Sequence, residues 1–217
     1  MNALEHEKRV AAIAAAALVE DGMTVGLGTG STVAHLLDAV AARGLTRIRC
    51  VSTSVATETR ARELGLAVED FDALDRLDIA IDGTDQVEPS GWLIKGGGGA
   101  HTREKIVAAA ADRFVVIADH TKVVDALTPP VPLELFAFGL PATLAALGAD
   151  VTVRAGAPRS PDDGVIDDFA GAFTDPAALA ARLAATPGVV DHGLFPAALV
   201  SDVLIARGDD VEHRSIG

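Results

Sequence analysis

Several residue types are scarce in this chain of 217 residues, and each scarcity excludes something. Cys50 is the single cysteine, so no disulfide can form within the chain, and its apolar neighbours predict a buried thiol in a reducing compartment. Basic residues are also few, because 18 lysines and arginines stand against 31 acidic residues, a net charge of −13. Such a charge argues against nucleic acid and against an anionic membrane surface as partners.

Long apolar runs and metal-ligand spacings are missing as well. The run from Val10 to Val19 is too short and too alanine-rich to span a bilayer, and a charged segment precedes it, so we expect a cytoplasmic protein. The six histidines show no ligand spacing, which predicts no metal site. Hydrophobic residues still make up 49% of the chain, enough for a globular core.

One stretch, residues 82–105, carries an unusual density of polar chemistry. It places Asp82 and Asp85 just after an apolar run, and Lys95 directly before four glycines. Glu104 follows in the expected first turn of a helix. A turn or a helix-end charge would explain any one of these features. Four successive glycines are harder to explain, because each glycine loses much conformational entropy on folding and has no side chain to pack. They suit a site where backbone N–H groups must approach a ligand, and the neighbouring lysine predicts that this ligand is anionic.

A second glycine-rich segment follows the strand expected at residues 23–27. Gly28-Thr29-Gly30-Ser31-Thr32 leads into a helix, so it aims N–H groups, a helix N-terminus and hydroxyls at an anion. A dinucleotide-binding turn needs glycine or alanine where Ser31 stands, and a P-loop needs a lysine after its glycines. The segment therefore favours a small phosphate monoester.

Strands and helices alternate over the first 122 residues. We expect strands at 23–27, 48–51, 77–81, 92–94 and 114–118, and helices at 10–18, 33–40, 55–64 and 103–110. Thr102 is the expected N-cap of the last helix. The polar clusters all follow strands, so in a parallel sheet they would meet at the carboxyl edge, where ligands bind.

The alternation breaks at residues 128–132, where three prolines argue against a central strand and indicate a crossing into a second unit. We expect a smaller α+β domain there, with Leu133–Phe138, strands near 150–153 and 165–168, and helices near 141–147 and 175–183. A strand at 199–205 then returns to the first domain. The predicted division is residues 1–128 with 198–217 against residues 129–197.

Together these motifs resemble those of the A-type ribose-5-phosphate isomerases. The match rests on the segments 28–32, 82–85, 95–105 and 118–122, in the same order and spacing, and it continues through Pro132-x-Glu134 and residues 187–195. Thr84, Gln86 and His101 stand where the family usually has Ala, Glu and Leu, and the segments 157–173 and 206–217 also depart from its pattern.

The resemblance implies a fold, an activity and a set of roles. The fold is α/β, a Rossmann-like open, mostly parallel sheet with a smaller inserted α+β domain, in a homodimer or homotetramer without a cofactor. The reaction interconverts D-ribose 5-phosphate and D-ribulose 5-phosphate through an enediol. The implied catalytic residues are Glu104 as general base, Asp82, Asp85 and Lys95. The implied substrate-binding residues are Thr29, Gly30, Ser31, Thr32, Asp82, Gly83, Thr84, Asp85, Lys95, Gly96, Gly97, Gly98 and Lys122.

Such a reaction needs one base that reaches both C1 and C2, hydrogen-bond donors for the developing oxyanion, and groups that bind the phosphate. Glu104 can supply the base, and Lys95 with the amides of residues 96–99 can stabilise negative charge. Residues 28–32 with Lys122 can hold the phosphate. Two effects on the pKa of Glu104 oppose each other, because a helix N-terminus lowers it and nearby carboxylates raise it. The sequence leaves that balance open.

Two other functions fit parts of the pattern. A sugar-phosphate-sensing regulatory module of related fold would bind without turnover, but it would need a DNA-binding segment, and the chain shows no basic helix-turn-helix extension. A coenzyme A transferase-like protein would use a carboxylate nucleophile, but the chain is short for so bulky a cofactor. Turnover of ribose 5-phosphate separates these possibilities.

Overall fold

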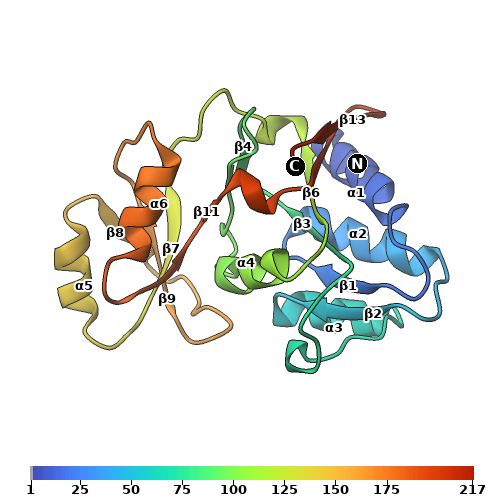
Figure 1. Ribbon diagram of the computed structural model, residues 1–217, viewed down its shortest axis with the longest axis horizontal. Helices are drawn as coiled ribbons and strands as arrows, with labels where there is room; N and C mark the ends of the chain where they lie inside the picture. Colours follow the sequence, from blue (N-terminus) through green and yellow to red (C-terminus); the bar gives the residue numbers. More distant parts are fainter. Residues whose placement is uncertain (1) are drawn as a thin grey trace.

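A computed structural model describes residues 2–217. The chain forms two lobes with a small three-stranded sheet between them (Figure 1). We call the six-stranded sheet and the helices around it the large lobe, and residues 131–192 the small lobe. Within residues 2–217 there is no helix whose length and apolar character would let it span a membrane.

The large lobe is built on a sheet with strand order β13-β12-β6-β3-β1-β2. All neighbouring strands run parallel except β12 and β13. The strands are β1 (Thr24–Leu27), β2 (Arg49–Ser52), β3 (Ile79–Gly83), β6 (Phe114–Asp119), β12 (Asp202–Arg207) and β13 (Asp210–Ser215). The chain order reverses between β1 and β3, and in an open α/β sheet ligands bind at the carboxyl ends of such a pair. The expected Rossmann-like, mostly parallel sheet is thus confirmed.

Helices cover both faces of this sheet. They are α1 (Ala3–Ala16), α2 (Ser31–Ala42), α3 (Val55–Glu63) and α4 (His101–Ala109). Ile79 and Ile81 of β3 pack in one core with α1 and α2, whereas Ala80 between them packs on the side of α4. Because both faces of the sheet are buried, the strand sequences are continuous apolar runs. Burial of each large apolar side chain stabilises the folded state by roughly 1.5–3 kcal/mol.

Two helices begin elsewhere than expected. Helix α1 starts at Ala3 because Asn2 caps it, its side chain accepting from the Glu5 N–H at 2.8 Å, so it is longer than its apolar stripe. The prediction that Thr102 caps α4 is wrong, because Ala100 occupies the N-cap position. The Thr102 hydroxyl instead donates to the Glu134 carboxylate, which lies in the small lobe.

The small lobe is an antiparallel sheet with order β10-β7-β9-β8. Its strands are β7 (Val131–Leu135), β8 (Val151–Val153), β9 (Val165–Phe169) and β10 (Val189–His192), with helices α5 (Leu140–Leu147) and α6 (Pro176–Ala184). Leu133 and Phe169 from the sheet share a core with Leu179 and Leu183 of α6.

Strand β7 lies inside this sheet although it contains Pro132, so the expectation that the prolines exclude a central strand is wrong. The Pro132 carbonyl accepts from the Gly193 N–H at 2.7 Å, one residue beyond the end of β10. The N–H that proline lacks would point to the same side, toward the Gly193 carbonyl, but that carbonyl accepts from the Lys95 N–H at 2.9 Å instead. No ladder bond is therefore lost.

The third sheet has the order β11-β5-β4 and is antiparallel. It consists of β4 (Gln86–Val87), β5 (Leu93–Ile94) and β11 (Leu194–Phe195). The strand expected at 92–94 is therefore not part of the parallel sheet, and Lys95 reaches the carboxyl edge from a different sheet than the other polar clusters do. The described part of the chain, residues 2–217, also contains three single-turn 3₁₀ helices, at Phe71–Ala73, His120–Lys122 and Ala197–Leu199.

Candidate active site

The glycine-rich turn after β1 is held against the end of β3. The Asp82 carboxylate accepts from the N–H groups of Thr29 at 3.0 Å and of Gly83 at 2.7 Å. A Cβ atom on Gly28 would lie 1.9 Å from Asp82 Oδ1, so only glycine allows this close approach. Asp82 thus fixes the turn that leads into α2.

The N-terminus of α2 and two lysines form one end of the site. Gly30 is the N-cap of α2, with φ 102°, and Ser31 is its first residue, so the free N–H groups of the first turn point into this region. Lys8 of α1 donates to Ser31 Oγ at 3.0 Å, and Lys122 approaches from the His120–Lys122 turn. Two ammonium groups therefore lie here in a chain that is acidic overall, and one of them, that of Lys8, also pairs with Glu5 at 2.6 Å.

Lys95 also lines the site, with only 3% of its side chain exposed. Its Nζ atom donates to the Gly83 carbonyl at 2.6 Å and lies 2.9 Å from Asp82 Oδ2. Burial alone would lower the pKa of Lys95, but the charges of Asp82 and Glu104 outweigh it, so the pKa lies above its ordinary value. Lys95 is therefore a permanent cation.

Glu104 stands in the first turn of α4 with 5% of its side chain exposed. Its Oε2 atom lies 3.1 Å from Lys95 Nζ but makes no hydrogen bond within residues 2–217, so this contact is electrostatic. Burial, then the charge of Asp82, raises the pKa of Glu104 to about 7 against the opposing effect of Lys95. The balance left open by the sequence is decided mainly by burial, which no pattern of charges reveals.

Residues 96–99, which we call the glycine loop, complete the site. Asp85 Oδ2 accepts from the Gly97 N–H at 2.8 Å, and the Gly99 N–H donates to the Gly96 carbonyl at 3.0 Å. Gly96 has φ +103°, and a Cβ there would collide with the fully buried ring of His101. Neither ring nitrogen of His101 has a partner within residues 2–217, and burial lowers its pKa to about 4.

A cavity of about 130 Å³ lies among these elements. Of the residues that the sequence singles out, all but Asp82 line it: Thr29, Gly30, Ser31, Thr32, Gly83, Thr84, Asp85, Lys95, Gly96, Gly97, Gly98, Glu104 and Lys122. Asp82 lies beneath the cavity, bonded to the turn and to Lys95. Lys8 also lines the cavity and was missed, because it precedes the apolar stripe of α1 and belongs to no motif.

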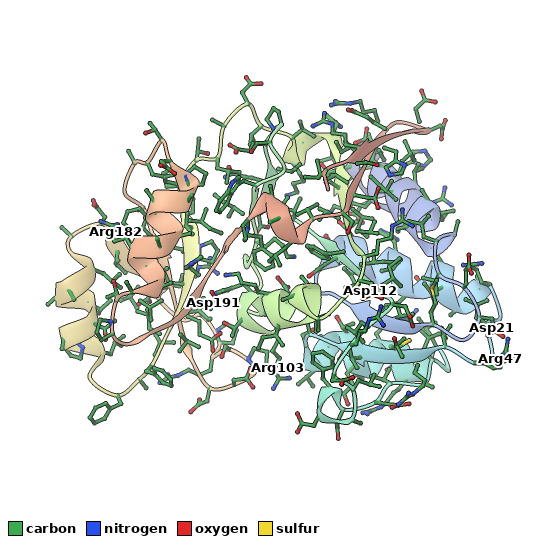
Figure 2. All side chains as sticks on the ribbon, viewed as in Figure 1. Asp21, Arg47, Arg103, Asp112, Arg182 and Asp191 are labelled. Carbon is green, nitrogen blue, oxygen red and sulfur yellow. The ribbon has the colours of Figure 1, made fainter. Side chains whose placement is uncertain are left out.

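The small lobe holds α4 on both sides of Glu104. Thr102 donates to Glu134 of β7, and Lys105 donates to Asp191 of β10 at 2.6 Å. Arg103 forms a two-pronged pair with Asp162 at 2.8 and 2.6 Å. Figure 2 shows Arg103 and Asp191 where α4 faces the small lobe. The helix that carries the candidate base is therefore anchored by the other lobe.

The chain also matches known proteins. Residues 49–210 match the family described as "Ribose 5-phosphate isomerase A (phosphoriboisomerase A)". The chain belongs to this family. A curated ribose-5-phosphate isomerase A from Roseiflexus sp. (strain RS-1) is 47% identical over 207 residues, which cover 89% of this chain and 88% of the relative. The family resemblance drawn from the motifs is thereby confirmed.

Solved structures of the ribose 5-phosphate isomerase A family share the fold. The enzyme from Neisseria gonorrhoeae is similar with a TM-score of 0.94 at 28% identity, covering 100% of this chain and 99% of that one. A D-ribose-5-phosphate isomerase in complex with phospho-erythronic acid gives a TM-score of 0.92 at 32% identity, covering 99% of this chain and 100% of that one. The expected fold class is confirmed along the whole chain.

Proposed function

We propose that this protein interconverts D-ribose 5-phosphate and D-ribulose 5-phosphate through an enediol, with Glu104 as the general base. The observation that carries the proposal is the pairing of Glu104, whose pKa is raised to about 7, with the buried cation of Lys95 at one end of a small cavity. A base with a pKa near the working pH both accepts and returns a proton efficiently.

The phosphate is assigned to the end formed by the first turn of α2 with Lys8 and Lys122. Backbone N–H groups at a helix N-terminus and two ammonium groups suit a dianion, and the net charge of −13 means that attraction must be local. A phosphate bound there directs the sugar carbons toward Glu104, which lines the same cavity.

In the reaction, the Glu104 carboxylate takes the proton from C2 of the open-chain aldose. The C–H electron pair forms the C1–C2 double bond, and O1 takes up negative charge beside Lys95 and the glycine loop. Return of the proton to C1 re-forms a carbonyl at C2, and the hydroxyl hydrogen passes from O2 to O1. The product is the ketose, and no atom is gained or lost.

The two aspartates are assigned different parts in this scheme. Asp82 is 3% exposed and is occupied by the turn and by Lys95, so its part is to keep Lys95 charged and in place. Asp85 lines the cavity and accepts a hydrogen bond from the Gly97 N–H. It is therefore assigned to bind the sugar hydroxyls and to assist the opening of the sugar ring. The cavity of about 130 Å³ is smaller than the roughly 300–1,000 Å³ of pockets for drug-sized ligands, which favours a small substrate.

The experiment is to incubate the purified protein with ribose 5-phosphate in D₂O and follow the sugar by proton NMR. We expect ribulose 5-phosphate to form until both sugars coexist, with deuterium entering at the exchanged carbon. Binding of ribose 5-phosphate by calorimetry without any conversion would instead indicate a regulatory module, and it would overturn the proposal.

We also propose that the protein is a homodimer or homotetramer. In support, Phe136 and Phe138 are 59% and 95% exposed beside α5, and exposed apolar patches of this kind commonly mark protein interfaces. Light scattering on the purified protein measures the mass directly. A mass of 22.2 kDa at micromolar concentration would contradict this part of the proposal.

A further inference from the structure

The small lobe reaches the glycine loop through Arg154, which directly follows the edge strand β8. Its Nε and Nη2 atoms donate to the two oxygens of Asp168 at 2.5 and 2.7 Å. Its Nη1 atom donates to the Gly97 carbonyl at 3.0 Å. Asp168 in β9 therefore fixes the plane of the guanidinium, and the remaining nitrogen bonds the main chain of the other lobe.

Gly97 is consequently held on both sides. Its N–H donates to Asp85 of the large lobe at 2.8 Å, and its carbonyl accepts from Arg154 of the small lobe. A glycine has no side chain to restrain its backbone, and its freedom in the unfolded chain is the largest of any residue. Here two charged side chains supply that restraint from outside the loop.

The bond to Arg154 also sets the direction of the next N–H group. In a trans peptide the carbonyl of Gly97 and the N–H of Gly98 point in opposite directions. Gly98 lines the cavity, whereas Arg154 does not. Within residues 2–217 the Gly98 N–H has no hydrogen-bond acceptor, so it is available to a bound molecule.

We propose that Arg154 is a positioning residue for the isomerisation: it turns the Gly97–Gly98 peptide so that the Gly98 N–H meets the oxygen that becomes negative in the enediolate. The inference rests on the proposed function and deepens it. A guanidinium on the carbonyl also polarises the peptide and strengthens its N–H as a donor. The small lobe thereby contributes to the reaction as well as to the anchoring of α4.

The test compares the steady-state kinetics of Arg154→Met and Arg154→Lys with those of the wild type. Methionine removes the donor, so kcat should fall by about 100-fold, the effect of losing one preorganised oxyanion donor, while KM for ribose 5-phosphate stays within about threefold. Lysine keeps the charge but lacks the planar fork that bonds Asp168 and Gly97 at the same time. The kcat of Arg154→Lys should therefore lie between that of the wild type and that of Arg154→Met.

Arg49→Met is the matched control. Arg49 of β2 forms the same kind of two-pronged pair, with Glu69 at 2.8 and 2.7 Å, but its side chain makes no hydrogen bond to the glycine loop or to α4. Its kcat should stay within about threefold of the wild type, because only a surface ion pair is lost. Thermal unfolding of each variant confirms that the kinetics are measured on folded protein. If Arg154→Met does not fold, Asp168→Asn serves instead, since it frees the guanidinium without removing it.

Three results would overturn the inference. They are a kcat within threefold of the wild type in Arg154→Met or its substitute, an equal loss of kcat in Arg49→Met, and a loss confined to KM. The proposed function is judged separately, by wild-type turnover. An active wild type with an unaffected Arg154→Met removes the role of Arg154 alone, whereas an inactive wild type removes both.

Discussion

The Nζ atom of Lys95 lies 3.1 Å from Oε2 of Glu104, and both side chains are almost completely buried. The same nitrogen lies 2.9 Å from Asp82 Oδ2. The single positive charge of Lys95 thus lies next to two carboxylates and cannot neutralise both. Burial and Asp82 make Glu104 a stronger base than an exposed glutamate, while the charge of Lys95 stays beside the place where an oxyanion would form.

The raised pKa of Glu104 predicts an acid limb in the pH profile. Glu104 must be ionised to act as a base, so kcat/KM should fall as the pH drops through about 7 and level off above it. Asp82 raises the pKa of Glu104, so Asp82→Asn should move the limb to lower pH, whatever it does to the maximal rate.

The measurement is kcat/KM for ribose 5-phosphate between pH 5 and 9 in both proteins. The substrate phosphate titrates near pH 6 in either case, so the displacement between the two curves is the informative quantity. Superimposable acid limbs would contradict the assignment of the limb to Glu104.

Lys122→Ala tests the phosphate end of the cavity. The variant should lose roughly 1.5–3 kcal/mol of transition-state stabilisation with ribose 5-phosphate, the value of a charge-assisted hydrogen bond. Free ribose lacks the phosphate, so it should be a very poor substrate and should lose little more in the variant. The comparison is kcat/KM for both sugars, supported by inhibition constants for inorganic phosphate. An equal fall for both sugars would show that Lys122 does not bind the phosphate.

Asp167 of β9 is fully buried, and neither of its carboxylate oxygens has a partner within residues 2–217. Burial raises the pKa of this carboxyl, so the folded state holds the proton more tightly than the unfolded state does. Its ionisation therefore costs stability at neutral pH, and the cost disappears as the pH falls toward the ordinary carboxyl pKa.

Asp167→Asn should accordingly raise the free energy of unfolding at pH 7, by roughly 1–3 kcal/mol, and the gain should shrink toward pH 4. Urea unfolding at several pH values measures it. The exposed Asp210→Asn is the control and should change little at any pH. A variant less stable than the wild type at pH 7 would mean that Asp167 is paired in solution.

Much of the large lobe could be predicted from the sequence, because each motif occupies a local position at the end of a strand. The pairs of Gly28 with Asp82 and of Gly96 with His101 could not, since they depend on contact between segments far apart in the chain. The prediction for Pro132 was wrong for a similar reason: what a proline costs depends on whether the carbonyl opposite its missing N–H has another donor, here the Lys95 N–H.

The candidate site likewise contains residues that local motifs predict and residues that only the packing of distant segments brings together. The motifs predicted every residue that lines the cavity except Lys8, which belongs to no motif and is brought there by the packing of α1. Arg154 does not line the cavity and was also missed, because only the packing of the small lobe brings it to the Gly97 carbonyl. The direction of the Glu104 pKa shift also required knowing its burial. That residues 129–197 fold as a separate domain stays a prediction.

The central claim is that Glu104 carries the proton, and Glu104→Gln tests it most directly. The amide keeps the shape of the side chain but cannot accept the proton, so kcat should fall by about 10³ or more. Binding of ribose 5-phosphate, measured by calorimetry, should stay within about fivefold, because the residues assigned to the phosphate are unchanged. Glu63→Gln, at an exposed position of α3, is the control and should retain full activity. The decisive measurement is single-turnover conversion of ribose 5-phosphate by Glu104→Gln: the account predicts a loss of at least about three orders of magnitude with the ligand still bound, and a loss of less than about tenfold would place the base elsewhere.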